Sequence, residues 1–473
     1  MKKLFLLIFL FTAKAAFSQG LDNFLSDTTL IHSSFSLYVA DVETGQTVLD
    51  IYSEKSLVPA SILKLITTAA AIELLGPDHV FNTAVGYTGT LNKAGMLKGD
   101  IIIKGGGDPV FASPRFPFYY GDFPYRWIDE IKRTGIRKVS GRVIVDDSYY
   151  DYNPVPSGWL WEDAGNYYGA GVYGASIYDN SYDIHFITSS AGTKPVITEI
   201  VPEDCSTSLE NNLVADGNTD NGYIFSSPYG NNGWMTGTIP VNQEDFVLGA
   251  SIQDPPMIFA KSIDVALRND GVKIKGSPTT ARIEKIRPIN EYKTVAKYTS
   301  PFLSEIIDTL NHISVNLYAE TLVKELDKHY KGKGTLQNGL KIINLYLDSL
   351  GIKGMYLADG SGLSRANAIN AKGLTELLIH MKNNGRYFDY YLNSLPDAGK
   401  EGTLKNWFRD DVFAGNLKAK SGSMTRVRSY AGYFTSKSGR QMAFTFIAND
   451  FPSPSANIVA HYENILREII LYY

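Results

Sequence analysis

A serine and a lysine three residues apart lie near the start of a strongly apolar segment. The segment runs from Val58 to Gly76 as VPASILKLITTAAAIELLG, and Ser61 and Lys64 are its candidate reactive groups. Residues three apart on a helix share one face, so Oγ of Ser61 and Nζ of Lys64 can meet. Apolar neighbours disfavour the ammonium form, and a neutral amine can accept the proton of an attacking serine. The pattern predicts a nucleophile with its general base.

Ser314 and Asn316 form a second polar cluster, in the stretch NHISVNLYAE just before a predicted helix. The hydroxyl could relay a proton to a leaving amine, and the amide could hold a substrate amide. A helix cap would explain Ser314 equally well when it is taken alone.

A third cluster, Lys420 to Ser423, ends the stretch GNLKAKSGSMT. An edge strand here could pair with an extended peptide, its lysine could face a carboxylate, and Gly422 would allow close backbone approach. A strand-to-turn junction is the plainer interpretation of Lys420. The ordered set S-x-x-K, S-x-N and K-[ST]-G is much rarer than its parts and indicates a serine acyl-enzyme.

The predicted elements that would position these residues lie near both ends of the chain. They indicate one domain whose two parts are separated in the sequence. Residues 34–49 predict a β-hairpin, residues 429–450 predict two strands around a turn, and an amphipathic helix follows them. Both chain ends should therefore share one sheet. Pro59 predicts a helix start that places Ser61 in the first turn, where backbone N–H groups favour an oxyanion.

The predicted fold class is α/β (α+β), with an antiparallel sheet and helices interrupted by a large β-rich insertion. The expected parts are a signal peptide (1–18), a first domain segment (19–80), an inserted region of two subdomains (81–285) and a second domain segment (286–473).

With these motifs the sequence resembles the D-alanyl-D-alanine carboxypeptidases/endopeptidases of the penicillin-binding protein 4 type, the DacB family of low-molecular-mass class C penicillin-binding proteins. The segments IKGGGDP (from Ile103), GWLWEDAGNYYGA (from Gly158) and LADGSGLSRAN (from Leu357) also look like family segments. The resemblance implies a β-lactamase/transpeptidase-like domain. The family usually has threonine where this chain has Ser421, which keeps the hydroxyl.

The resemblance implies a serine carboxypeptidase, a D,D-endopeptidase, or both, acting on peptidoglycan stem peptides and acylated by β-lactam antibiotics. Ser61 would attack the penultimate carbonyl, Lys64 would be the base, and Ser314 would pass a proton to the leaving nitrogen. Asn316 would bind the substrate backbone. The identity of the acylation base is disputed among such enzymes.

By the same resemblance, Lys420 and Ser421 would face the terminal carboxylate of the substrate. The backbone N–H groups of Ser61 and Ser423 would form the oxyanion hole.

A pocket for the diaminopimelate side chain is implied as well. Asp163 would pair with its amine and Arg365 with its carboxylate, with Tyr168 beside them. A surface salt bridge or a loop cap is the alternative for these residues.

Composition limits the partners and the compartment. The chain has 473 residues, a formal charge of −4 and a pI near 6.0, which gives no basic field for nucleic acid. Lys2 and Lys3, the run LFLLIFLF and a small-residue exit predict a signal peptide cleaved after Ser18 and export to the periplasm or cell envelope, without a transmembrane anchor.

No cofactor and no metal site are expected. The seven histidines form no close ligand pair, so a zinc peptidase is disfavoured, and His312 near Ser314 is more typical of a cap than of a triad. The acidic run at residues 146–153 could suggest calcium but lacks the spacing of a known calcium loop.

Two other functions fit the same pattern. A β-lactamase would share the acyl-enzyme but hydrolyse it quickly, and an idle cell-wall-binding scaffold would keep only the fold. The sequence leaves open the balance of carboxypeptidase and endopeptidase activity and the oligomeric state.

Overall fold

The computed structural model describes residues 19–205, 208–286, 289 and 291–473. The predicted signal peptide lies outside these residues. Within them, no helix combines the length and apolar character needed to span a membrane. The chain forms two compact units. Among the described residues, the first contains 19–77, 303–315 and 340–473, and the second contains 78–205, 208–286, 289, 291–302 and 316–339.

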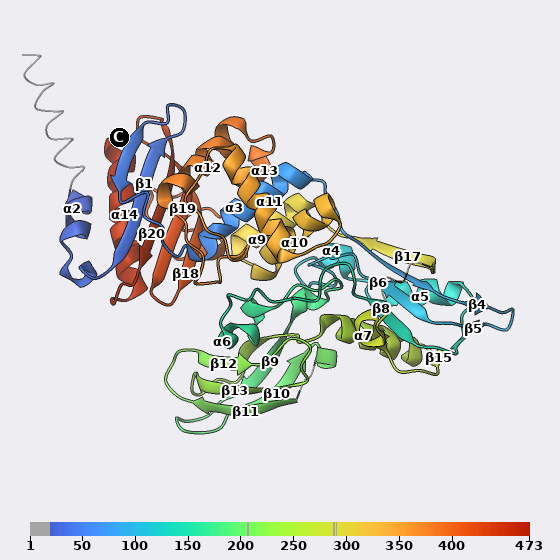
Figure 1. The fold of residues 1–473 in the computed structure, drawn as a ribbon. Coiled ribbons are helices and arrows are strands. Elements are labelled where there is room, and N and C mark those ends of the chain that lie inside the picture. The colour runs from blue at the N-terminus through green and yellow to red at the C-terminus, as the bar shows by residue number, and fades with distance from the viewer. Residues whose placement is uncertain (1–18, 206–207, 287–288, 290) are drawn as a thin grey trace, which may run out of the picture. The chain divides into compact units, whose positions relative to one another are not determined.

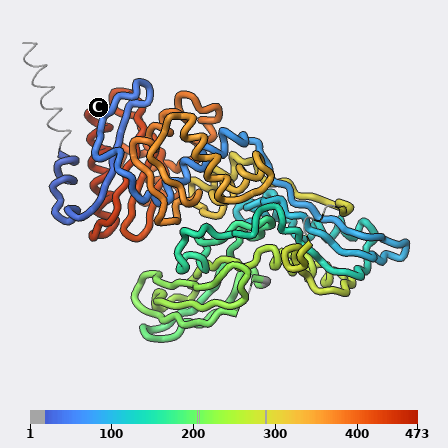
Figure 2. The backbone as a smooth tube through the Cα atoms, viewed as in Figure 1, coloured from blue at the N-terminus to red at the C-terminus, as the bar shows by residue number. Residues whose placement is uncertain are grey.

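An antiparallel sheet of order β18-β19-β20-β1-β2 forms the centre of the first unit (Figure 1). Its strands are β1 (Ser34–Asp41), β2 (Thr47–Ile51), β18 (Lys418–Met424), β19 (Val427–Thr435) and β20 (Gln441–Asn449). Strand β1 pairs with β20 along its whole length, and Figure 2 shows these blue and red segments side by side. The prediction that both chain ends share one sheet is confirmed.

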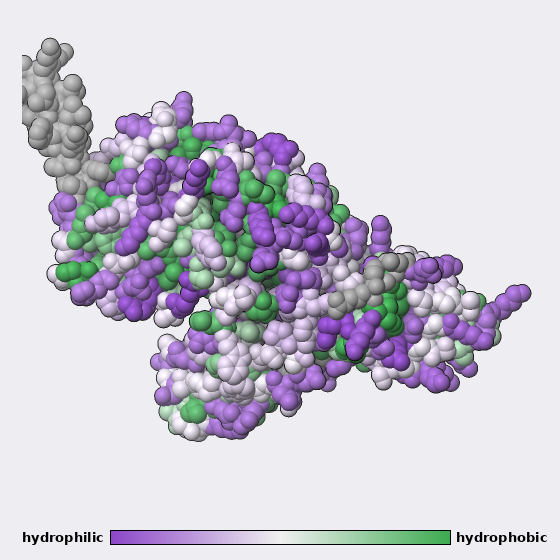
Figure 3. Space-filling view, viewed as in Figure 1, coloured by the Kyte–Doolittle hydropathy of each residue, from purple (hydrophilic) through white to green (hydrophobic). Residues whose placement is uncertain are grey.

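One face of this sheet packs against the C-terminal helix α14 (Ser455–Tyr472) and the short helix α2 (Gln19–Ser26). Phe24, Phe444, Phe446 and Leu466 belong to the core between them, each at most 1% exposed. Burying a side chain of this size contributes about 1.5–3 kcal/mol relative to leaving it in water. In the view of Figure 3 the surface of this unit is mainly hydrophilic, with scattered apolar groups.

Helices cover the other face of the sheet, where α12 packs on β1 and β20. The helices of the first unit, besides α2 and α14, are α3 (Lys64–Leu75), α9 (Leu303–Ile313), α12 (Ala371–Asn384), α13 (Phe388–Asn393) and most of α11 (Leu336–Ser349). Nearly every residue of α3 is buried, which explains its continuous apolar sequence.

Two predicted helices differ in detail from the structure. The segment after Pro59 begins with a 3-10 turn, η2 (Ala60–Leu63), before α3 starts at Lys64. The helix predicted after Ser314 is α10 (Asn316–Lys331), which is not continuous with α9, because Ser314 between them has a left-handed φ of 63°.

The second unit is rich in strands and, among the described residues, holds four of the five sheets. A mixed sheet of order β16-β8-β6-β3-β17 contains β3 (Asn82–Tyr87), β6 (Ile101–Lys104), β8 (Val143–Asp146), β16 (Thr279–Thr280) and β17 (Lys293–Thr299). A smaller sheet contains β4 (Thr90–Leu91), β5 (Met96–Lys98), β7 (Lys138–Val139) and β15 (Lys273–Ile274).

Two three-stranded sheets complete the second unit. They contain β9 (Ser181–Ile187), β10 (Val196–Val201) and β14 (Phe246–Ser251), and β11 (Ser208–Ala215), β12 (Asn221–Phe225) and β13 (Asn232–Ile239). Its helices are α4 (Pro117–Tyr120), α5 (Tyr125–Arg133), α6 (Trp161–Ala164), α7 (Pro255–Asn269), α8 (Ala281–Glu284) and α10 (Asn316–Lys331). Helix α10 belongs to this unit although the sequence placed it after the insertion, and the domain limits given above stay a prediction.

Candidate active site

Ser61 lies in the 3-10 turn η2, directly before helix α3. Its neighbour Ala60 has a φ of 50°, a left-handed conformation that residues with a Cβ seldom adopt and that clusters at functional sites. Gly362, itself at φ 85°, packs so closely on this turn that a Cβ there would lie 2.0 Å from the carbonyl oxygen of Ala60. The turn is therefore held by a loop almost 300 residues further along the chain.

The structure brings Ser61 and Lys64 together. Nζ of Lys64 donates a hydrogen bond to Oγ of Ser61 at 2.9 Å and another to the carbonyl oxygen of Ser361 at 2.7 Å. The Lys64 side chain is fully buried (0% exposed), so its amine is fixed beside the hydroxyl rather than extended into water. This geometry suits proton transfer from Ser61 to Lys64.

The loop that carries Ser361 is organised by the buried carboxylate of Asp359. This carboxylate accepts hydrogen bonds from the backbone N–H groups of Gly362 (2.8 Å) and Ser364 (2.6 Å) and from Nδ2 of Asn367 (2.8 Å). These bonds hold the Ser361 carbonyl where Lys64 reaches it. The loop belongs to the segment LADGSGLSRAN that resembles the family, but no local pattern in the sequence marks a role for Asp359 or Ser361.

Lys420 and Ser314 form a second amine–hydroxyl pair in the same unit. Nζ of Lys420 donates to Oγ of Ser314 at 2.9 Å and to the carbonyl oxygen of Ser421 at 2.9 Å. Lys420 is 0% exposed, and its burial together with the positive charge of Lys64 holds the pKa of Lys420 well below its ordinary value of 10.5. A positive charge on Lys64 therefore disfavours a positive charge on the buried Lys420.

The lowered pKa of Lys420 predicts a pH-dependent stability. Between that lowered pKa and 10.5 the unfolded chain binds more protons than the folded protein, so the free energy of unfolding should rise as the pH rises through this window. Urea unfolding at several pH values should show that Lys420→Met removes this rise. The exposed Lys405→Met is the control and should keep the wild-type slope; equal slopes for both variants would contradict the assignment.

Gly422 lies on β18 beside the turn that carries Ser61. A Cβ at this position would lie 2.2 Å from Oγ of Ser429, 2.7 Å from the carbonyl oxygen of Pro59 and 3.0 Å from the backbone nitrogen of Ser61. Only glycine allows this approach, as the sequence predicted for a K-[ST]-G motif.

Strand β18 is an edge strand, in agreement with the sequence analysis. An isolated bridge pairs its first residue, Lys418, with Asp397, and the N–H of Ala419 donates to the carbonyl oxygen of Pro396 at 3.3 Å. In the described part of the first unit no other strand pairs with this edge beyond Ala419. The edge is thus open from Lys420 onward, where an extended peptide could pair.

Thr403 is a site residue that the sequence analysis missed. Oγ of Ser421 donates to its Oγ1 at 2.7 Å, so two hydroxyl groups lie together beside the open edge. No local motif marks Thr403, because its relevance comes only from the folding of residues 402–404 onto β18.

The remaining predicted site residues are divided between the two units. In the second unit, Nδ2 of Asn316 donates to the carbonyl oxygen of Tyr168 at 2.8 Å, and the N–H of Leu160 donates to the buried Asp163, at 3.2 Å. Burial and the charge of Asp163 raise the pKa of Tyr168. Arg365 belongs to the first unit, where it is exposed and only 3.4 Å from the carbonyl oxygen of Thr425. A common pocket for Asp163, Tyr168 and Arg365 stays a prediction.

His312 and the acidic run at residues 146–153, which were considered for a triad and for calcium, have partners nearby. His312 lies 3.0 Å from the carbonyl oxygen of Asp308 through Nδ1 and 3.4 Å from Glu401 through Nε2. Asp146 pairs with Lys104 at 2.8 Å. Across the described residues, no three His, Cys, Asp or Glu side chains are grouped so that they could hold a metal ion.

This chain is similar to known proteins along most of its length. The model of the D-Ala-D-Ala carboxypeptidase 3 (S13) family matches residues 17–466. A D-alanyl-D-alanine carboxypeptidase of Actinomadura sp. (strain R39) is 28% identical over 451 residues, which cover 92% of this chain and 81% of that protein. The D-alanyl-D-alanine carboxypeptidase DacB of Haemophilus influenzae is 24% identical over 464 residues, which cover 93% of this chain and 92% of that protein.

Solved structures with this fold include penicillin binding protein 4 (dacB) of Haemophilus influenzae, with a TM-score of 0.80, 23% identity, and coverage of 93% of this chain and 96% of that chain. A predatory peptidoglycan endopeptidase of Bdellovibrio bacteriovorus has a TM-score of 0.52 and 16% identity. The match covers 93% of this chain and 92% of that chain. The predicted fold class is confirmed.

Proposed function

Because the chain belongs to the D-Ala-D-Ala carboxypeptidase 3 (S13) family and is thus a serine carboxypeptidase, we propose that Ser61 is the nucleophile with which it cleaves D-Ala-D-Ala ends of peptidoglycan stem peptides. The observation that carries this proposal is the 2.9 Å hydrogen bond between Oγ of Ser61 and the buried Nζ of Lys64. A serine is a weak nucleophile at its ordinary pKa and needs an adjacent base of this kind.

In the first half-reaction, Oγ of Ser61 attacks the carbonyl carbon of the penultimate D-alanine, and its proton passes to the neutral amine of Lys64. The backbone N–H groups of Ser61 and Ser423 stabilise the oxyanion that forms. The amide bond then breaks as the proton held by Lys64 passes, by way of the hydroxyl of Ser314, to the leaving nitrogen; Ser314 is itself hydrogen-bonded to Lys420. Free D-alanine leaves, and the peptide remains as an ester of Ser61.

In the second half-reaction, a water molecule attacks the ester carbonyl. The amine of Lys64, neutral again, takes a proton from this water, and when the ester bond breaks it returns that proton to Oγ of Ser61. The shortened peptide leaves as a carboxylate.

The substrate would lie along the open edge of β18. Its terminal carboxylate would face Lys420, Ser421 and Thr403, whose polar groups converge there. Asn316 would hold a backbone amide of the stem peptide. Asp163 and Arg365 would bind the amine and the carboxylate of the diaminopimelate side chain, with Tyr168 beside them.

β-Lactam antibiotics should acylate Ser61, because they present a carbonyl carbon and a carboxylate in a similar arrangement. A Haemophilus influenzae penicillin binding protein 4 structure with 22% identity and a TM-score of 0.76 is complexed with a novel beta-lactam. That relative supports the same chemistry here.

We also propose that the protein acts in the periplasm or cell envelope. The basic start and the apolar run of residues 1–18 support export. Mass spectrometry of the protein from its host should give an N-terminus at Gln19.

Ser61→Ala should abolish covalent labelling by a fluorescent penicillin and reduce D-alanine release from a stem pentapeptide by about 10⁴-fold or more, since loss of the nucleophile removes the acyl-enzyme route. The label is read on a denaturing gel, and released D-alanine is measured by a coupled oxidase assay. Ser438→Ala, in the exposed turn before β20, is the matched control and should behave as wild type.

Three outcomes would contradict the proposal. Rapid turnover of the label by the wild type would indicate a β-lactamase. Peptidoglycan binding without D-alanine release would indicate a scaffold. Normal activity of Ser61→Ala would place the nucleophile elsewhere.

A further inference from the structure

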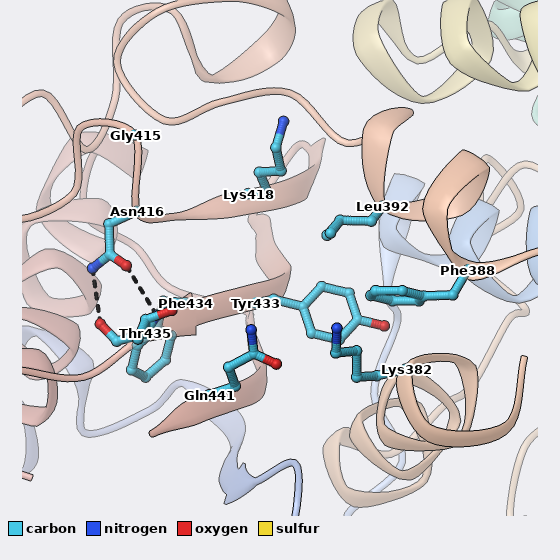
Figure 4. Close-up of a pocket in the computed structure, with 10 residues that line it drawn as sticks. All are labelled: Lys382, Phe388, Leu392, Gly415, Asn416, Lys418, Tyr433, Phe434, Thr435 and Gln441. Atoms are coloured by element: carbon cyan, nitrogen blue, oxygen red, sulfur yellow. Dashed lines mark hydrogen bonds between the residues drawn. The ribbon is translucent and has the colours of Figure 1, made fainter. Parts of the chain in front are cut away.

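A small pocket in the first unit has no role in the proposed reaction. It lies between helices α12 and α13 and strands β18, β19 and β20, and its volume is about 130 Å³ (Figure 4). All of its lining residues belong to the first unit.

Aromatic side chains form the wall of the pocket. The rings of Phe388 and Tyr433 meet edge to face, with centroids 5.6 Å apart and an interplanar angle of 86°. Oη of Tyr433 donates to the carbonyl oxygen of Leu378 at 2.7 Å, which fixes the position of its ring. Leu392 of α13 lies next to Phe388 and Tyr433 in Figure 4. The apolar surface is therefore formed before any ligand arrives.

Lys382 places a positive charge on this apolar wall. Its Nζ lies 4.7 Å from the centroid of the Phe388 ring, and no ion pair joins it to a carboxylate of the described residues. The second lysine of the pocket differs, because Lys418 is paired with Asp397 at 2.8 Å. The exposed Gln441 also lines the pocket (Figure 4), and no acidic side chain does.

We propose that this pocket binds a small organic anion that consists of a carboxylate attached to one ring or one branched apolar group. An apolar cavity of about 150 Å³ accommodates benzene, so a volume of this order suits one ring. The carboxylate would accept a charge-assisted hydrogen bond from Lys382 and a second hydrogen bond from the Gln441 amide. An uncharged ring compound would lose the first of these interactions.

The pocket is close to the strand that carries Lys420. Tyr433 lies opposite Lys418 in the pairing of β18 with β19, and Ala431 lies opposite Lys420. Opposite residues of an antiparallel pair share one face of the sheet, and positions two residues apart are separated by about 6.6 Å along a strand. A ligand in contact with Tyr433 and Lys418 would therefore occupy the same face as Lys420, which lies two pairs further along, without entering the site of Ser61.

Phenylacetate is a suitable probe, followed by saturation-transfer difference NMR on the full chain. We expect ring-proton signals with millimolar affinity for the wild type, unchanged after Ser61 has been acylated by a penicillin. Lys382→Met should weaken the affinity by about 10-fold or more, because it removes a charged hydrogen-bond partner. The exposed Lys405→Met should leave it unchanged.

Leu392→Trp fills the pocket and should abolish the signals. Thermal unfolding of both pocket variants shows whether they are folded. If Leu392→Trp does not fold, the affinity of Lys382→Met still decides the test. The proposal is overturned if the wild type gives no signal, if acylation removes it, or if Lys382→Met binds like wild type. None of these readouts depends on D-alanine release, so this inference and the proposed function can fail separately.

Discussion

Lys64→Met should slow acylation of Ser61 by about 100- to 10,000-fold, the range that general bases contribute. Methionine is close to lysine in length and fills the same buried space, but it cannot accept the proton of Oγ. The rate is measured by stopped-flow labelling with a fluorescent penicillin at saturating concentration, so that a change in binding does not contribute.

The stability of the same variant separates chemistry from folding. Loss of Nζ leaves the Ser361 carbonyl without this hydrogen bond, which costs about 1–3 kcal/mol for a buried acceptor, whereas removal of a buried amine acts in the opposite direction. We therefore expect the free energy of unfolding to change by no more than about 3 kcal/mol. Lys437→Met, in the exposed turn after β19, is the control. A Lys64→Met variant that acylates at the wild-type rate would exclude Lys64 as the base.

Gly422→Ala should reduce acylation by about 100-fold, although it adds only one methyl group. The new Cβ would meet the carbonyl oxygen of Pro59 at 2.7 Å and the nitrogen of Ser61 at 3.0 Å, and neither backbone atom can rotate away. Strand β18 or the Ser61 turn must shift, and a displacement of about 1 Å at a reacting group costs on the order of 100-fold in rate. Labelling kinetics with a fluorescent penicillin measure the loss.

A second substitution tests whether the effect is steric. The shortest contact of the added methyl group is with Oγ of Ser429 at 2.2 Å, so Ser429→Ala in the same chain should restore part of the rate. Gly439→Ala lies in an exposed turn where the added methyl group has no neighbour within 4 Å; because its φ of 87° favours glycine, this variant controls for backbone strain far from Ser61 and should leave acylation unchanged. A Gly422→Ala variant with wild-type rates would show that this close approach does not matter.

The residues that could be predicted from sequence are those whose partners are near in sequence or belong to an ordered motif. The Ser61–Lys64 contact follows from a helical spacing of three, and the edge position of Lys420 follows from an extended stretch ending in small residues. Alternating polarity at both ends of the chain predicted the shared sheet because each strand has one face in the core.

The residues that could not be predicted depend on contacts between distant segments. Asp359, Gly362 and Thr403 act through loops that fold onto the site from elsewhere in the chain, and no local pattern reports this. Ala60 and Ser314 have left-handed φ values that neither residue type favours, so tertiary packing must impose them. The placement of Asp163, Tyr168 and Asn316 relative to Ser61 rests on the family resemblance.

The pairing of β1 with β20 has a consequence for synthesis. Strand β1 emerges from the ribosome about 400 residues before its neighbour β20, and β18, which completes the amine pair, also comes late. Contacts between such distant segments slow folding, because the closing of a long chain precedes any gain from the pairing. A chain that ends before Gln441 leaves β1 without this neighbour, so cleavage activity should arise only once the C-terminal strands have joined the sheet.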